Sequence, residues 1–197
     1  EFGGPEMMKQ VEIPDPEPSD GEVVVDVARA GINFGDTHIT HNEYLAKQDL
    51  PLVPGGEIAG TDPDGRRVAA MLANGGYAQK VAVPEAWLVP LPDEVSDEQA
   101  AAVLVQGVTA HALLHYCAHV EEGETVVVEA AAGGTGSLAV QLAKRAGAKV
   151  IAFASREQKR ELGGRLGADA DADSLAVALK AAILAVLGFV PGAAASA

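Results

Sequence analysis

Residues 125–154 decide the fold, and they read TVVVEAAAGGTGSLAVQLAKRAGAKVIAFA. The segment 124–129 is a short run of valines typical of a buried strand, and 149–154 has the same character. Between them, a glycine-rich loop over 130–136 leads into a helix over 137–146 with one apolar stripe, which Gly147 ends. A strand, a short loop, a helix and a second strand form a βαβ unit, so we expect a parallel sheet.

The loop of this unit consists of small residues that suit a bound phosphate. Small residues let the backbone come close to a pyrophosphate, whose charge is held by N–H groups at the start of the helix. The loop matches the dinucleotide fingerprint, with Ala131 where the first glycine usually stands. The flanking strand and helix favour this interpretation over a tight turn without a ligand. The predicted contacts are Ala131, Ala132, Gly133, Gly134, Thr135 and Gly136.

The residues at the end of the second strand indicate which dinucleotide the loop would bind. An NAD site places an acidic residue about 20 positions after the glycines, for the ribose 2′-hydroxyl. Here the strand ends in Ala154 and Ser155, and Ser155, Arg156 and Lys159 offer donors suited to a 2′-phosphate. Glu157 lies one turn into the next helix, and the alternative for the basic residues is a solvated helix face. We therefore expect NADPH rather than NADH.

The first half of the chain has the pattern of β-structure. Residues 22–30 alternate, and further short strands are expected at 57–61, 66–71, 77–83 and 87–90, with Gly- and Pro-containing turns between them. This spacing is typical of a small barrel or sandwich. Short helices are expected at 36–41, 97–104, 108–118 and 156–166, and an alanine-rich helical segment is expected to run to about residue 187.

Composition and charge exclude several classes of function. The net charge of −14 argues against binding to nucleic acid or to anionic lipid. The single cysteine, Cys117, excludes an internal disulfide and a thiolate-rich zinc site, and it favours a cytoplasmic location. The uncharged run 181–197 is interrupted by Gly188, Pro191 and Gly192, so we do not expect a membrane anchor there.

Several further motifs occur in order along the chain. They are GINFGDT at 31–37, PGGEIAG at 54–60, GGYA at 75–78, GVTA at 107–110 and LGAD at 166–169. Together with the phosphate loop, they resemble the quinone oxidoreductase branch of the medium-chain dehydrogenase/reductase superfamily. The resemblance implies a GroES-like β-barrel domain, placed at 1–98, followed by a Rossmann domain at 99–197. It also implies an active site in the cleft between the two domains.

The resemblance points to the zinc-free members of the superfamily. In the zinc alcohol dehydrogenases a Cys and a His bind the catalytic zinc, and the matching positions here are Asn33 and Gly56, so no metal is expected. By position, Asn33, His38 and Tyr44 are the candidate catalytic residues, and Thr109 is expected near the nicotinamide. The alternatives are a turn residue for Asn33 and a surface aromatic for Tyr44.

Two other patterns could suggest a metal site, and both are rejected. His111, His115 and His119 stand at i, i+4 and i+8 of a predicted helix, but no carboxylate shares their register. The acidic residues at 169, 171 and 173 lack the glycine and the closing glutamate of a calcium loop. A solvated helix face is the favoured interpretation of the histidines.

The predicted Rossmann domain is incomplete. A full doubly wound domain has about six strands, whereas only two convincing strands follow residue 124. We therefore expect that 197 residues are not the whole natural chain. The predicted function is NADPH-dependent hydride transfer to quinones without zinc. The alternatives are reduction of enoyl or α,β-unsaturated carbonyl compounds, and a non-catalytic NADPH-binding or structural role. The sequence is compatible with a homodimer.

Overall fold

The computed structural model describes residues 1–174. The chain forms two compact units, Glu1–Val105 and a second that begins at Gln106. The two units meet within helix α2 (Asp97–His111). The predicted domain boundary between residues 98 and 99 lies earlier in this helix and stays a prediction. The apolar run 181–197 and the predicted helical segment up to residue 187 lie outside the described residues.

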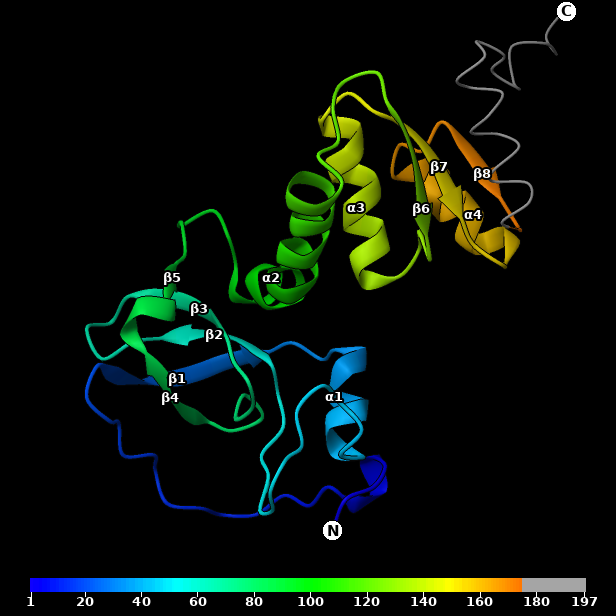
Figure 1. Cartoon of the computed structure of the whole chain (residues 1–197). Helices are drawn as coiled ribbons and strands as arrows, with labels where there is room; N and C mark the ends of the chain where they lie inside the picture. Colours follow the sequence, from blue (N-terminus) through cyan, green and yellow to red (C-terminus); the bar gives the residue numbers. More distant parts are fainter. Residues whose placement is uncertain (175–197) are drawn as a thin grey trace, which may run out of the picture. The chain divides into compact units, whose positions relative to one another are not determined.

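The first unit is built on one antiparallel sheet of five strands in the order β4-β1-β2-β3-β5 (Figure 1). Its strands are β1 (Glu22–Ala30), β2 (Glu57–Thr61), β3 (Arg67–Met71), β4 (Lys80–Pro84) and β5 (Val89–Pro90). β1 pairs with both β2 and β4, and an irregularity between Val27 and Arg29 shifts its register against β2. One core cluster of this unit consists of Val25, Ile58, Val68, Ala70, Val81 and Val83.

Short helical segments complete this unit. They are η1 (Pro5–Met7), α1 (Phe34–Thr40) and η2 (Glu85–Trp87). α1 begins two residues earlier than the predicted helix at 36–41, because Asn33 already serves as its N-cap. β4 begins at Lys80 rather than at Tyr77, because the N–H of Tyr77 donates to the carbonyl oxygen of Pro54 (2.9 Å) in a loop contact. η2 replaces the start of the strand predicted at 87–90.

The helices predicted at 97–104 and 108–118 are in fact continuous. α2 (Asp97–His111) runs through Gly107, and π-helix η3 (Ala112–Cys117) follows directly. A glycine inside a helix costs only about 1 kcal/mol, so Gly107 does not end it. The start of α2 is a reciprocal cap, in which the N–H of Gln99 donates to Ser96 Oγ and the N–H of Ser96 donates to Gln99 Oε1. By length and composition alone, Asp97–Cys117 could cross a membrane, a test that core helices of soluble proteins also pass.

The second unit contains a parallel sheet in the order β6-β7-β8. Its strands are β6 (Thr125–Glu129), β7 (Lys149–Phe153) and β8 (Ala170–Ala172), and its helices are α3 (Gly134–Arg145) and α4 (Glu157–Arg165). The predicted βαβ unit is therefore present, and a third strand extends it. β8 was not predicted, because three residues are too few to show a period. Val128, Val140, Val150 and Ala152 lie in the core between α3 and the sheet.

Candidate functional site

The glycine-rich loop turns tightly between β6 and α3. Gly133 is the N-cap of α3 in extended conformation, and Ala130 has a positive φ of 49°. A Cβ atom at Gly136 would lie 2.2 Å from the carbonyl oxygen of Ala130, so only glycine fits at that position. The first amides of a helix have no acceptor within the helix, and here they belong to residues without bulky side chains. This geometry can bind a phosphate group.

Ala131 has a structural reason to be small. Its side chain is fully buried in the core of the second unit. Its N–H donates to the carbonyl oxygen of Phe153 (3.1 Å), which ties the loop to the end of β7. The loop therefore keeps its position relative to the sheet with alanine where the fingerprint usually has the first glycine.

A glutamine that was not among the predicted contacts lies against this loop. The hydroxyl of Thr135 donates a hydrogen bond to the side-chain carbonyl oxygen of Gln106. A Cβ atom at Gly134 would lie 3.0 Å from the side-chain carbonyl carbon of Gln106, so the two residues are in close contact. Thr109 stands three residues after Gln106 in α2, and this spacing puts both on one side of the helix. No sequence motif signals the contact between residues 106 and 135.

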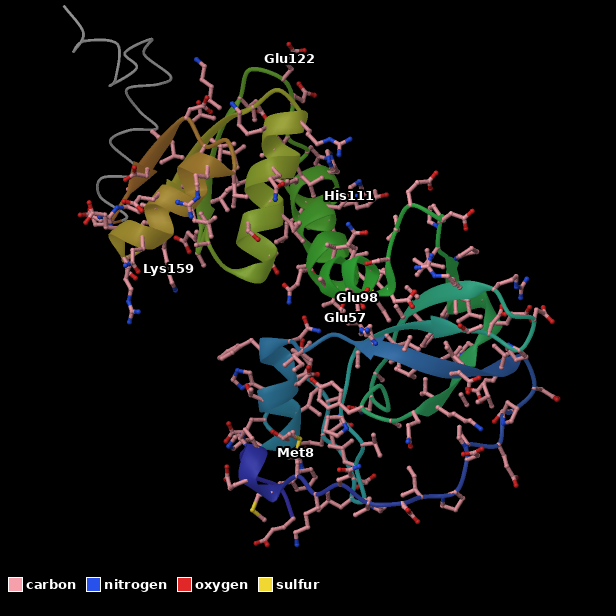
Figure 2. All side chains as sticks on the ribbon, turned by 180° about the vertical axis from the view of Figure 1, so that it is seen from behind. Met8, Glu57, Glu98, His111, Glu122 and Lys159 are labelled. Carbon is pink, nitrogen blue, oxygen red and sulfur yellow. The ribbon has the colours of Figure 1, made fainter. Side chains whose placement is uncertain are left out.

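The three residues predicted to bind a 2′-phosphate lie together where β7 leads into α4. Ser155, Arg156 and Lys159 are all exposed, and Arg156 is the N-cap of α4. Lys159 projects outward from α4 (Figure 2). Arg160 differs from them, because its guanidinium donates to the carbonyl oxygen of Ala154 (3.2 Å) and lies 3.3 Å from the carboxylate of Asp171. The cluster of predicted contacts is thus well placed to bind an anion at the end of β7.

In the first unit, Asn33 belongs to a network of polar groups around two buried carboxylates. The N–H of Asn33 donates to Asp36 Oδ2 (2.8 Å), and the hydroxyl of Tyr77 donates to the same oxygen (2.7 Å). Asp36 is only 6% exposed. Burial, together with the hydrogen bond to the Asp36 carboxylate, raises the pKa of Tyr77 well above its ordinary value, so Tyr77 stays a protonated donor.

The side chain of Asn33 also contacts a second buried acid. Its Nδ2 donates to Glu57 Oε1 (2.8 Å), and the backbone N–H of Val105 donates to Glu57 Oε2 (2.7 Å). Glu57, labelled in Figure 2, is the first residue of β2 and is 2% exposed. In the sequence it was noted only as part of a motif and was given no role. The available signal was an acidic residue inside the otherwise apolar and small-residue segment PGGEIAG.

The other two candidate catalytic residues, His38 and Tyr44, lie on α1 and shortly after it. His38 lies on α1, and its ring meets that of Phe34 edge-on, with 5.1 Å between the ring centroids. The Tyr44 ring lies 3.6 Å from the position of a Cβ at Gly35, so it packs against α1. Around them Ile32, Phe34 and Leu45 are strongly exposed, which makes this surface apolar. The structure thus gathers Asn33, His38 and Tyr44 around one short helix.

The histidine pattern does not form the helix face that its spacing predicts. His111 and His115 do lie close, with 4.4 Å between their ring centroids. His119 lies beyond the end of η3 with a positive φ of 50°, so it does not continue their row. Within residues 1–174, no group of three His, Cys, Asp or Glu side chains is arranged to hold a metal ion.

Comparisons with known proteins match both units. Residues 19–61 match the family of the alcohol dehydrogenase GroES-like domain. A quinone oxidoreductase from Pongo abelii is 34% identical over 174 residues, which cover 82% of this chain and 53% of the relative. The chain therefore spans about half the length of the curated relative that it matches.

Solved structures show the same likeness. The quinone oxidoreductase from Thermus thermophilus, whose structure was also solved in complex with NADPH, is 43% identical with a TM-score of 0.77, over 82% of this chain and 54% of that chain. A quinone oxidoreductase from Pseudomonas syringae is 37% identical with a TM-score of 0.87, over 95% and 61%. These findings confirm the predicted fold class, a GroES-like domain followed by a Rossmann-type parallel sheet.

Proposed function

Because the chain belongs to the quinone oxidoreductase branch of the medium-chain dehydrogenase/reductase superfamily, we propose that it is an NADPH-dependent oxidoreductase, or a part of one, that transfers hydride to a quinone without zinc. The phosphate loop at the start of α3 is the observation that carries this proposal. A cytoplasmic location and a homodimer stay predictions.

NADPH fits the residues of the second unit. The amides of the first turn of α3 would hold the pyrophosphate, and the absence of a Cβ at Gly136 keeps the loop in its tight turn. Ser155, Arg156 and Lys159 would bind the 2′-phosphate, since Ala154 and Ser155 rather than an acidic residue follow β7. Thr109 and the phosphate-loop residues complete the proposed cofactor contacts. The Thermus thermophilus relative, solved with NADPH, supports this choice.

The acceptor would bind at the surface around α1. Bound NADPH would supply the hydride, and a quinone that receives it needs one proton to become a hydroquinone. Asn33, His38 and Tyr44 are polar groups that can orient the acceptor carbonyl, and His38 or Tyr44 can deliver that proton. The exposed apolar side chains of Ile32 and Phe34 suit contact with an aromatic or quinoid ring.

Chemistry without zinc agrees with the residues at the positions of the zinc ligands in the alcohol dehydrogenases. Gly56 has no side chain, and the Asn33 amide donates to Glu57. Quinones accept hydride readily, so oriented hydrogen-bond donors suffice in place of a Lewis acid.

The proposal is tested in two steps on the purified chain. Calorimetry should detect binding of NADPH, and Gly136→Ala should abolish it, because the added Cβ would overlap the carbonyl group of Ala130. Gly164→Ala is the matched control, because a Cβ there meets nothing within 4 Å. Oxidation of NADPH should then be faster with a benzoquinone than with an enone. A faster reaction with the enone would indicate that the substrate is an unsaturated carbonyl compound and not a quinone. NADPH binding without oxidation by either acceptor would contradict an enzymatic role.

A further inference from the structure

Glu57 is a buried acid that the proposed reaction does not use. It is 2% exposed, and its two oxygens each accept one hydrogen bond, Oε1 from Asn33 Nδ2 (2.8 Å) and Oε2 from the N–H of Val105 (2.7 Å). Both partners are neutral N–H groups. Burying a carboxylate is costly, so a site that keeps one must satisfy its oxygens well.

The backbone around Glu57 is built to enclose this side chain. A Cβ atom at Gly31 would lie 2.2 Å from Glu57 Oε1 and 2.4 Å from the carbonyl oxygen of Ala101. The N–H of Gly31 donates to the carbonyl oxygen of Glu57 itself (3.0 Å). Only glycine can therefore stand at position 31 while the carboxylate holds its place.

The hydrogen-bonding pattern determines how the Asn33 amide is turned. An ionised carboxylate only accepts hydrogen bonds, whereas an asparagine amide has one accepting end and one donating end. An O–H on either oxygen of Glu57 would face an N–H donor, so the geometry fits the ionised form. The Asn33 amide then turns its nitrogen toward Glu57 and its oxygen toward the backbone N–H of Asp36, with which it forms the capping box of α1.

From this geometry, we propose that Glu57 is a positioning residue for Asn33, because its buried carboxylate holds the amide nitrogen while the capping box of α1 holds the amide oxygen, so that only one of the two possible orientations satisfies both. The inference deepens the proposed function and rests on it only for the consequence in turnover. Because Glu57 is only 2% exposed, it would act through Asn33 and not by contact with the acceptor. Glu57 determines which way the amide nitrogen and the amide oxygen of Asn33 point.

Glu57→Gln tests the proposal directly. A glutamine can satisfy only one of the two N–H donors, and the backbone N–H of Val105 is fixed, so the oxygen of the new side chain should face Val105. Its amide nitrogen would then face the amide nitrogen of Asn33, so Asn33 must either lose this hydrogen bond or turn over and give up its cap on the N–H of Asp36. The side-chain amide resonance of Asn33, assigned by its loss in Asn33→Asp, should shift and exchange with solvent faster in E57Q. Turnover of quinone should fall roughly ten- to hundredfold while NADPH affinity stays unchanged.

Glu98→Gln is the matched control, because Glu98 is an exposed acid of the same unit that pairs with Arg29. It should leave the Asn33 resonance and turnover unchanged. The proposal is overturned if E57Q leaves the Asn33 amide resonance where it is in the wild-type chain. This readout is independent of activity, so a chain without NADPH oxidation would contradict the proposed function and still leave the positioning role tested.

A double variant keeps the test decisive if E57Q or N33D is destabilised. Asn33→Asp alone places two carboxylates at hydrogen-bond distance, and its unfolding midpoint should fall. Adding Glu57→Gln supplies an N–H that donates to the new aspartate and an oxygen that accepts from Val105, so the midpoint should recover. A double variant as unstable as the sum of the two single variants would show that the residues are not coupled and would overturn the inference.

Discussion

The hydroxyl of Thr135 donates a hydrogen bond to the side-chain carbonyl oxygen of Gln106, which links α2 to the first turn of α3. The two residues are separated by 29 positions in the chain. Gln106 also lies against Gly134, so it contacts the phosphate loop at two consecutive residues. The hydrogen bond supports the loop from the side of α2. The glycines of the loop cannot do this, because they have no side chains.

Gln106→Ala should therefore weaken NADPH binding. A neutral hydrogen bond contributes about 0.5–1.5 kcal/mol, so we expect the Kd for NADPH to rise roughly three- to tenfold. Calorimetry measures this change. Gln141→Ala is the control, because the Gln141 side chain is bonded to the carbonyl oxygen of Ser137 on the exposed side of α3. Similar Kd values for Q106A and the wild-type chain would show that the support has no effect on the cofactor.

The ion pair of Asp169 with Lys144 predicts a pH dependence of stability. Partial burial opposes the charge of Asp169, but the Lys144 ammonium (2.8 Å) and the N–H of Val150 (2.7 Å) outweigh it and lower the pKa of Asp169 below its ordinary value. Because folding lowers the pKa of Asp169, its carboxylate contributes to the free energy of unfolding. This contribution is complete above about pH 4 and is lost as the pH falls through the folded-state pKa.

Asp169→Asn should consequently lower the free energy of unfolding at pH 7 by about 1 kcal/mol, a value reduced for the partial exposure of the pair. The difference from the wild-type chain should shrink below about pH 4. Urea unfolding at both pH values measures it, with the exposed Asp173→Asn as control. A difference that is the same at pH 7 and at low pH would show that the charge of Asp169 does not stabilise the fold.

Two neighbouring glycines of α4 should respond in opposite ways to the same substitution. A Cβ at Gly163 would lie 2.6 Å from the Cβ of Ala152 in the core, whereas a Cβ at Gly164 meets nothing within 4 Å. Gly163→Ala should destabilise the chain by about 1–3 kcal/mol through overpacking. Gly164→Ala should stabilise it by about 0.5–1 kcal/mol, because alanine has less backbone freedom to lose in a helix. Thermal unfolding distinguishes the two, and equal effects would contradict the close packing of α4 on β7.

The parts of the fold that depend on local pattern could be predicted from the sequence. The βαβ unit was predicted correctly because the valine runs and the apolar stripe of α3 each extend over several residues. β8 was missed because Ala170–Ala172 is too short to carry a period. The break predicted near Gly107 was wrong, since tertiary packing overrides the modest cost of one glycine in α2.

The candidate site also has a part that the local sequence pattern predicts and a part that it does not. The phosphate loop is contiguous, so its small residues and flanking elements could be recognised together. Glu57 and Gln106 form hydrogen bonds with partners 24 and 29 positions away, and such pairs follow no local spacing rule. A buried acid in the segment 54–60 was a visible anomaly, but only the packed structure shows that Asn33 is its partner.

The preference for NADPH over NADH depends on the exposed donors at the end of β7. Changing Ser155 and Lys159 together to alanine removes a hydroxyl and an ammonium group that would bind the 2′-phosphate, and each hydrogen bond to a charged group contributes about 1.5–3 kcal/mol. The Kd for NADPH should rise at least roughly tenfold, whereas that for NADH, which lacks the phosphate, should hardly change.

Arg165→Ala serves as the control for this change, because Arg165 is an exposed cation in the last turn of the same helix. Loss of a charge there should weaken binding of both dinucleotides only slightly, because the interaction between exposed, well-separated charges is largely screened. Calorimetric titration of both nucleotides into both variants separates a local contact from a general effect of charge. If the double alanine variant lost affinity for NADH as much as for NADPH, these residues would not recognise the 2′-phosphate, and the acid-free end of β7 would no longer explain the choice of cofactor.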